Sequence, residues 1–341
     1  MKKILVTGGA GYIGSHTIIE LIEGTDCEVI SVDNYANSTP KTYERIKSIT
    51  GKEVVHYDID LCNPDAVEKM FRANKDIDGI IHFAAFKSVP ESMSDPLLYY
   101  QNNLRSLVTM LRAVKEYHIP HFIFSSSCSV YGNIDKLPVN EKMPLGAISP
   151  YGYTKQVGER IVQDFIQSYP GAKAVLLRYF NPAGAHISGK IGEVPLQRPS
   201  NLVPVITQTA IGKLKETTIF GTDYHTRDGS CIRDYVHVSD IARAHIDALT
   251  YLNQNKEAPP CSIFNLGNGD GVSVLEAIAA FERVSGLKLN YRIGPRRDGD
   301  VEAIYSDITL SKNVLKWEPR YSLDDMMLSA WKWEQNMKKE A

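Results

Sequence analysis

The stretch that decides the fold is Thr-Gly-Gly-Ala-Gly-Tyr-Ile-Gly at residues 7–14. It stands between an apolar run, Lys3 to Val6, and the helical periodicity of Ile13 to Ile22. The glycines match Gly-x-x-Gly-x-x-Gly, and an overlapping Gly-x-Gly-x-x-Gly begins at residue 9. Because glycine has no Cβ, such a segment permits a tight turn and lets a pyrophosphate reach backbone N–H groups at the helix N-terminus. Taken alone, the motif also fits an ordinary strand-to-helix turn.

Asp33 turns this motif into a prediction of a dinucleotide site. It follows a second apolar run, Val29 to Val32, about 20 residues beyond the glycines, as the dinucleotide fingerprint requires. An aspartate here can accept hydrogen bonds from the adenosine ribose hydroxyls and would repel a 2′-phosphate. The neighbours Asn34 and Tyr35 supply no arginine. The sequence therefore favours NAD over NADP as the cofactor.

Apolar runs and helical stretches alternate along the first half of the chain. The runs Ile80 to Phe83 and Phe122 to Phe124 are typical of buried parallel strands, whereas Pro64 to Arg72 and Pro96 to Tyr117 have helical periodicity. Strand–helix alternation predicts an α/β fold with a Rossmann-like, doubly wound parallel sheet.

The pattern changes near residue 181, where the chain becomes rich in proline and glycine with only short helical and strand segments. We expect residues 1–180 to form an NAD-binding Rossmann domain that contains the catalytic residues. Residues 181–341 are expected to form a smaller C-terminal α/β lobe for the substrate, with some of this chain returning to the first domain.

Composition excludes several classes of protein. The 341 residues include 38 Lys and Arg against 40 Asp and Glu. The net charge of -2 therefore gives no positive electrostatic field that would attract nucleic acid or a membrane surface. No stretch approaches the ~18 apolar residues of a membrane-spanning helix. Five scattered cysteines contain no Cys-x-x-Cys pair, which argues against a disulfide framework or a zinc site, and no histidine spacing indicates a metal. A cytoplasmic protein is expected.

Three residues indicate catalysis. Tyr151 and Lys155 are spaced i, i+4 on the helix expected after Pro150, so both side chains project from one face. A lysine ammonium, together with a positive nicotinamide ring, would lower the pKa of the Tyr151 phenol toward that of a general base. Ser127 ends the preceding strand, and the carboxyl ends of such strands line the ligand crevice. Without Ser127, the spacing alone would also fit a surface Tyr–Lys pair.

At this point the chain resembles the extended short-chain dehydrogenase/reductase superfamily and, within it, the family of UDP-glucose 4-epimerases. The resemblance extends over nearly the whole chain, and the order and spacing of its motifs are specific. These motifs are Gly-Ala-Gly-Tyr-Ile-Gly-Ser-His (9–16), Ile-His-Phe-Ala-Ala (81–85), Ser-Ser-Ser (125–127), Leu-Arg-Tyr-Phe-Asn-Pro (177–182), Arg-Asp-Tyr-Val-His-Val (233–238) and Asn-Leu-Gly-Asn-Gly (265–269).

The resemblance implies an isomerase that interconverts UDP-galactose and UDP-glucose through a transient 4-keto sugar, with no net redox change. Tyr151 would take the proton of the sugar 4-hydroxyl, Ser127 would hydrogen-bond the same oxygen, and hydride would pass from sugar C4 to NAD. Lys155 would hold the cofactor ribose. The keto sugar would then turn and receive the hydride on its other face. A homodimer formed through the helices 96–117 and 151–167 is also implied.

The resemblance further implies two sets of contacts. The cofactor set is Gly8, Gly11, Tyr12, Ile13, Gly14, Asp33, Asn34, Asn37, Ser38, Asp60, Leu61, Phe83, Ala84, Ala85, Lys87, Asn102, Ser127, Tyr151, Lys155 and Phe180. The UDP-sugar set is Lys87, Ser127, Tyr151, Asn181, Asn201, Leu202, Thr218, Ile219, Phe220, Arg233, Arg297, Asp300 and Ile304. The planar donor forks of the two arginines suit a pyrophosphate, although an ion pair with Asp234 or Asp300 is an alternative role.

Relatives with the same fold remove water from a nucleotide sugar or decarboxylate it. The 4,6-dehydratases of the superfamily carry an Asp-Glu pair just after the catalytic hydroxyl residue, where this chain has Cys128 and Ser129, so dehydration and decarboxylation are disfavoured. A non-catalytic dinucleotide sensor would lack part of the catalytic set, which this chain retains. Another NAD-dependent nucleotide-sugar epimerase remains an alternative.

One position leaves the substrate range open. Ile304 corresponds to the family position that gates the space around the sugar 2-substituent. A bulky tyrosine there restricts some members to glucose and galactose, whereas cysteine or serine admits N-acetylated sugars. Isoleucine is intermediate in bulk, so activity on UDP-GlcNAc and UDP-GalNAc is an open hypothesis.

Overall fold

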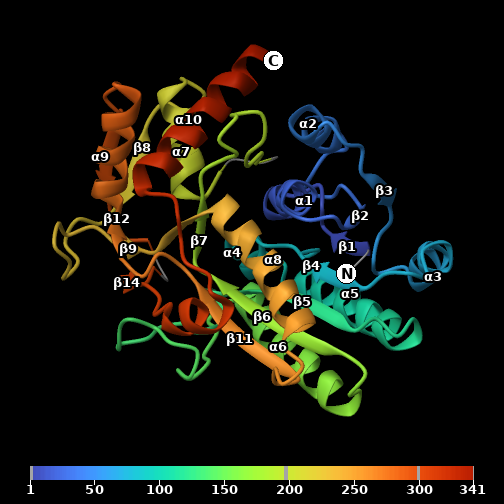
Figure 1. The fold of residues 1–341 in the computed structure, drawn as a ribbon. Helices are drawn as coiled ribbons and strands as arrows, with labels where there is room; N and C mark the ends of the chain where they lie inside the picture. Colours follow the sequence, from blue (N-terminus) through green and yellow to red (C-terminus); the bar gives the residue numbers. More distant parts are fainter. Residues whose placement is uncertain (1–2, 196–198, 298–299, 341) are drawn as a thin grey trace.

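A seven-stranded parallel sheet forms the centre of the computed structural model, which describes residues 3–195, 199–297 and 300–340 (Figure 1). The strand order is β11-β6-β5-β4-β1-β2-β3, and every neighbouring pair is parallel. The strands are β1 (Lys3–Thr7), β2 (Glu28–Asp33), β3 (Val55–Asp58), β4 (Gly79–His82), β5 (His121–Ser127), β6 (Lys173–Tyr179) and β11 (Cys261–Leu266). The predicted Rossmann-like α/β fold is confirmed. The strand order reverses between β1 and β4, which is where such sheets bind ligands.

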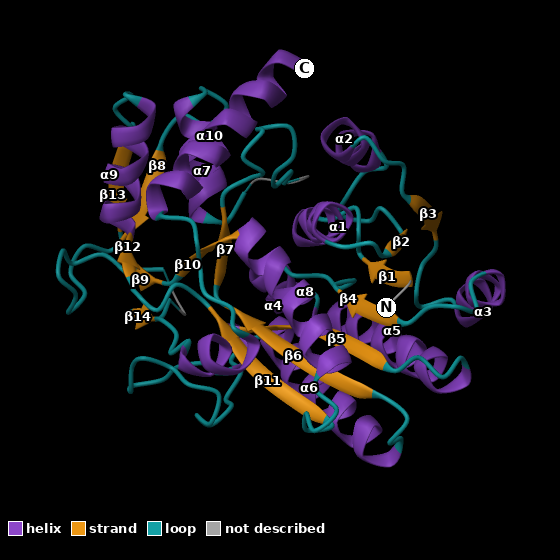
Figure 2. Ribbon diagram, in the orientation of Figure 1, coloured by secondary structure: helices purple, strands orange, loops and turns teal. Residues whose placement is uncertain are grey.

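Helices cover both faces of this sheet (Figure 2). Alternate strand residues face opposite sides: Ile4 and Val6 pack into the core beneath one helical layer, and Leu5 packs beneath the other. The first layer contains α1 (Tyr12–Gly24), α2 (Lys41–Thr50) and α8 (Val238–Gln254). The second contains α3 (Pro64–Ala73), α5 (Pro96–Glu116) and α6 (Pro150–Ser168), and the short α4 (Val89–Ser94) packs beside α5 and α6.

The start of each second-layer helix is encoded locally. Asn63, Asp95 and Ser149 cap α3, α5 and α6, and each side chain accepts a hydrogen bond from the backbone N–H three residues on. A proline follows each cap at the first helical position, where its missing N–H costs nothing. The helix that carries Tyr151 and Lys155 therefore begins at a residue fixed by sequence.

The remaining elements form a lobe at one end of the sheet (Figure 1). They are β7 (Asn181–Ala183), α7 (Leu202–Ala210), β8 (Thr217–Phe220), β9 (Ile232–Arg233), β10 (Tyr235–His237), β12 (Val272–Ser273), α9 (Val274–Ser285), β13 (Tyr291–Gly294), β14 (Ala303–Ile304) and α10 (Leu323–Glu340). A 3₁₀ turn at Cys128–Val130 follows β5, and a π-helical turn at Ser311–Leu315 packs against α8 and β11. Its core packs Ile206 of α7, Phe281 of α9 and Trp331 of α10 together. Because β11 and α8 join the central sheet, the chain crosses between the two regions more than once; the domain boundary at residue 180 stays a prediction.

Among the helices of the described chain, none is both long and apolar enough to cross a membrane.

Candidate active site

A cavity of about 950 Å³ lies where the carboxyl ends of the central strands meet the lobe. Every residue of the predicted cofactor set lines it. Nine members of the predicted UDP-sugar set line it as well: Lys87, Ser127, Tyr151, Asn181, Asn201, Arg233, Arg297, Asp300 and Ile304. The fold thus brings residues from both ends of the sequence to one site.

Four members of the UDP-sugar set, all within the described chain, do not line this cavity. Leu202 begins α7 directly after Asn201 and packs against the lobe core. Thr218, Ile219 and Phe220 form most of β8, where Ile219 is buried in that core. The Arg297 guanidinium lies 5.4 Å from the centroid of the partly exposed Phe220 ring.

The glycine turn between β1 and α1 is shaped for close approach. Gly8 has φ +69°, and a Cβ on it would stand 2.9 Å from the backbone nitrogen of Ala84 after β4. A Cβ on Gly14 would stand 2.3 Å from the Gly8 carbonyl oxygen. Gly11 is the N-cap of α1 and has no side chain to accept the first N–H groups, and residues 11–14 line the cavity. Such a helix start favours an anion.

Asp33 at the end of β2 is held firmly. Its Oδ2 accepts the Ala10 N–H at 3.0 Å, and its Oδ1 accepts the Tyr35 N–H at 2.9 Å and the Ser38 hydroxyl at 2.8 Å. Burial raises the pKa of this carboxyl, while these three hydrogen bonds oppose the rise. The carboxylate lies at the cavity wall, where the sequence places the ribose of a dinucleotide.

Ser127, Tyr151 and Lys155 come together from β5 and α6. Ser149 caps α6, so Tyr151 and Lys155 lie on its first two turns. The Lys155 ammonium donates to the Ser125 carbonyl at 2.7 Å and lies 5.1 Å from the centroid of the Phe124 ring. All three predicted catalytic residues line the cavity.

The pKa of Tyr151 is raised by the protein groups. Burial raises it to about 12, and the hydrogen bond with Ser127 offsets only part of that rise. The predicted lowering needs a nicotinamide ring beside the phenol as well as Lys155, so it stays a prediction; the Lys155 ammonium itself is directed at the Ser125 carbonyl. Burial also lowers the pKa of Lys155 to about 8, against the charge of Glu159, which raises it.

The two arginines share one acceptor. Arg297 binds Asp300 through two nitrogens at 2.7 and 3.1 Å, and Arg233 contacts the same carboxylate at 3.4 Å. Arg233 also donates to the Val301 carbonyl at 2.6 Å. The ion pair weighed as an alternative role is thus present, yet all three side chains line the cavity.

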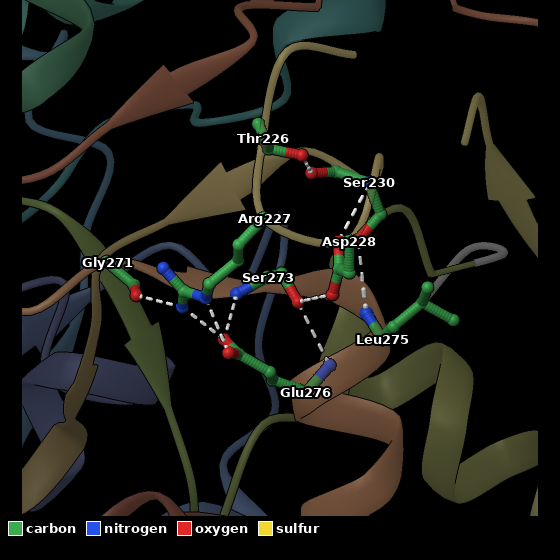
Figure 3. A network of polar contacts seen from close by, with 8 residues as sticks. All are labelled: Thr226, Arg227, Asp228, Ser230, Gly271, Ser273, Leu275 and Glu276. Atoms are coloured by element: carbon green, nitrogen blue, oxygen red, sulfur yellow. Dashed lines mark hydrogen bonds and ion pairs between the residues drawn. The ribbon is translucent and has the colours of Figure 1, made fainter. Parts of the chain in front are cut away.

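A polar network braces the strand that carries Arg233 (Figure 3). Asp228, in the loop before β9, accepts from the Ser230 N–H at 2.9 Å and from the hydroxyl of Ser273, the N-cap of α9. Arg227 pairs with Glu276 in the first turn of the same helix. The network ties the loop to α9 and so fixes where β9 begins.

Glu193 is a cavity residue that the sequence analysis missed. Its Oε1 accepts from the Lys87 ammonium at 2.8 Å and from the Asn201 amide at 3.1 Å, so one carboxylate joins a residue of each predicted set. An acidic residue gives no periodic signal, and its partners are distant in sequence. Glu159, a buried neighbour of the site that does not line the cavity, was also missed, although it follows Lys155 by i+4 and Tyr151 by two such steps, a spacing that could have indicated it.

Comparison with known proteins identifies the class. A model of the NAD dependent epimerase/dehydratase family matches residues 4–267, and the chain belongs to that family. Among relatives, the UDP-glucose 4-epimerase of Dictyostelium discoideum is 46% identical over 332 residues, covering 97% of this chain and 95% of that protein. The UDP-glucose 4-epimerase of Bacillus subtilis is 44% identical over 331 residues, covering 97% and 96%.

A solved structure agrees with this assignment. The UDP-glucose-4-epimerase from Stenotrophomonas maltophila, with bound NAD and formylated UDP-arabinopyranose, has a TM-score of 0.96 and 42% identity over all of both chains. The predictions of this family, of its fold, of an isomerase and of NAD as the cofactor are confirmed. The individual contact residues remain predictions.

Proposed function

We propose that this chain reversibly epimerises UDP-galactose and UDP-glucose at sugar C4. The observation that carries the proposal is the single cavity that joins Ser127, Tyr151 and Lys155 to the glycine turn and to the lobe residues Arg233 and Arg297. The relatives at 46% and 44% identity are named for this reaction.

The residues present fit NAD. Glycines at residues 8 and 14 let the backbone of the turn pack against Ala84 and against the start of α1, where a Cβ would collide, and the start of α1 offers backbone N–H groups to a pyrophosphate. Asp33 offers a buried carboxylate at the place of the adenosine ribose, where a 2′-phosphate would be repelled. When bound, NAD accepts a hydride from sugar C4 and returns it.

Each catalytic side chain then has one task. Tyr151 removes the proton of the 4-hydroxyl as C4 loses its hydride, and returns it when the carbonyl is reduced on the other face. Ser127, which hydrogen-bonds the Tyr151 phenol, orients the same sugar oxygen. Lys155 adds positive charge at this end of the cavity, and the Ser125 carbonyl fixes its ammonium. Arg233 and Arg297 bind the pyrophosphate that carries the sugar.

Dehydration has no acid–base pair at the corresponding place. Cys128 and Ser129 line the cavity directly after Ser127. Burial raises the pKa of the Cys128 thiol to about 12, so the thiol stays neutral near pH 7. The cavity therefore favours epimerisation over elimination.

The experiment that tests the proposal uses the purified protein with UDP-galactose and no added NAD. Appearance of UDP-glucose, followed by chromatography, is the expected result because a cofactor that is reduced and reoxidised in each turnover need not leave the site. No conversion, even with NAD supplied, would refute the UDP-hexose assignment and leave another nucleotide-sugar epimerase as the alternative.

The substrate range depends on Ile304. It is buried, lines the cavity and packs with Val130, Tyr131 and Phe180. A side chain of this size leaves more room than tyrosine would, which favours entry of N-acetylated UDP-sugars. Running the same assay with UDP-GalNAc tests this.

A homodimer is proposed from the exposed apolar side chains of α5 and α6. Leu97 is 75% exposed, and Leu98, Val108 and Tyr153 are also exposed on these two helices. Exposed apolar groups gathered on one pair of helices are typical of an interaction site. Cytoplasmic location remains a prediction; Cys62, Cys128, Cys231 and Cys261 are free thiols, as a reducing compartment would keep them.

A further inference from the structure

A buried ion pair lies directly behind the catalytic residues. Glu159 of α6 and Arg178 of β6 are 1% and 2% exposed, and they are joined by hydrogen bonds of 2.6 and 2.8 Å. The Ser126 hydroxyl donates to the same carboxylate at 2.5 Å. The third guanidinium nitrogen of Arg178 donates to the Tyr131 hydroxyl at 2.9 Å. β5, β6 and α6 therefore meet at this ion pair, and Tyr131 after β5 joins it through Arg178.

The strand register explains why Ser126 points to this pair. Ser126 of β5 is the parallel partner of Arg178 on β6, and side chains at even positions of β5, such as Phe122 and Phe124, face the helical layer that contains α6. Figure 2 shows β5 and β6 side by side with α6 against them. Ser126 thus faces the helix, while the residues on either side of it serve the cavity.

Ser125 and Ser127, which flank Ser126, contact the proposed catalytic side chains. The carbonyl of Ser125 holds the Lys155 ammonium, and the hydroxyl of Ser127 contacts the Tyr151 phenol. A rotation of the peptide on either side of Ser126 would move one of these groups. The hydrogen bond from Ser126 to Glu159 resists that rotation.

Stability alone does not account for such a pair. Burying two charges costs desolvation energy, and apolar residues of similar volume often serve the fold equally well. What an apolar pair cannot supply is a hydrogen-bond acceptor for Ser126 and a negative charge one helical turn from Lys155.

We propose that Glu159 is a positioning residue of the active site: it fixes the carboxyl end of β5 against α6, and its charge supports the Lys155 ammonium. The inference rests on the proposed function, because it assigns Lys155 a catalytic role. Glu159 does not line the described cavity, so it acts through Lys155, Ser125 and Ser127 rather than on the substrate.

The surroundings of Lys155 single out this carboxylate. Burial lowers the pKa of Lys155 to about 8, and the charge of Glu159 raises it. Three other titratable groups near it are neutral at pH 7: the pKa of His82 on β4 is lowered to about 3, that of Tyr151 is raised to about 12, and that of Tyr179 on β6 is raised well above its usual value. The charged Arg178 guanidinium is paired with the Glu159 carboxylate itself.

The test follows the titration of Lys155 by ¹³C NMR of lysine-labelled protein, with its signal assigned by its loss in Lys155→Arg. In Glu159→Gln the midpoint should move to lower pH. Because this variant leaves Arg178 as an unpaired buried cation and could fail to fold, the double variant Glu159→Gln/Arg178→Met is measured beside it. Asp164→Asn, on the exposed face of the same helix, is the matched control and should leave the midpoint in place.

Turnover of UDP-galactose supplies the second measurement. In both Glu159 variants kcat should fall several-fold at pH 8 and less at pH 6.5, while the KM for UDP-galactose stays unchanged. An unmoved Lys155 midpoint in a folded variant would overturn the inference, as would an equal shift in Asp164→Asn. Failure of the wild-type protein to convert UDP-galactose would instead refute the proposed function, and the NMR titration would still decide the role of Glu159.

Discussion

The Tyr151 hydroxyl allows the sharpest test of the proposed chemistry. Tyr151→Phe keeps the ring in the cavity wall and removes only the oxygen that contacts Ser127. In this variant the Ser127 hydroxyl keeps Ser129 as a partner: its oxygen lies 3.1 Å from the Ser129 hydroxyl oxygen and 3.2 Å from the Ser129 backbone nitrogen. The free energy of unfolding should therefore fall by ~1 kcal/mol or less. A positioned acid–base group contributes ~10²- to 10⁴-fold in rate, or about 3–5 kcal/mol of barrier. We expect kcat to fall by that factor.

The assay compares UDP-galactose turnover, melting temperature and bound NAD in Tyr151→Phe and in Tyr153→Phe. Tyr153 lies on the same helix but is 47% exposed and does not line the cavity, which makes it the matched control. Only the first variant should lose turnover, and both should keep their NAD and their melting temperature. Turnover of Tyr151→Phe within tenfold of wild type would refute this reasoning and make Ser127 the next candidate for the base.

Four further predictions follow from the same geometry. Asp33→Ala removes the acceptor of three hydrogen bonds at the ribose position, so the protein should lose NAD on dialysis, measured by absorbance of the released cofactor; full retention would contradict this. Burial raises the pKa of Asp247 to about 6, above the value of 3.8 in an unfolded chain, so the folded state binds this proton more tightly and stability falls as pH rises through that window. Asp247→Asn should therefore raise the free energy of unfolding at pH 8 by ~1 kcal/mol or less, because the side chain is partly solvated, with a higher melting temperature as the readout and no change at pH 4; a gain at pH 4 would contradict the sign. Leu97→Glu should convert the dimer to a monomer in light scattering without lowering the melting temperature of the monomer fold, whereas an unchanged mass would place the interface elsewhere. Ile304→Tyr should abolish activity on UDP-GalNAc and spare UDP-galactose, and equal losses would refute the gate.

The parts of the site that the sequence predicted depend on local rules. The glycine turn and Asp33 follow from a strand, a tight turn and a helix in immediate succession. Tyr151 and Lys155 share a helix whose start is set by Ser149 and Pro150, so their common face follows from spacing alone.

The parts that the sequence did not predict depend on contacts between distant segments. Glu193 joins Lys87 to Asn201, and the first of these bonds spans 106 residues of chain. Nothing local to Glu193 distinguishes it from a solvated acid. Phe220 lies outside the described cavity because of how β8 packs on the lobe. No short sequence motif predicts that packing.

The pKa of Tyr151 shows that the acid–base behaviour of this site depends on its cofactor as well as on the protein groups. Burial raises this pKa to about 12 and lowers that of Lys155 to about 8, so the protein groups alone favour a neutral phenol and weaken the ammonium that should stabilise a phenolate. Positive charge added beside the phenol acts in the opposite direction. We therefore expect proton removal by Tyr151 to depend on occupancy of the nicotinamide position.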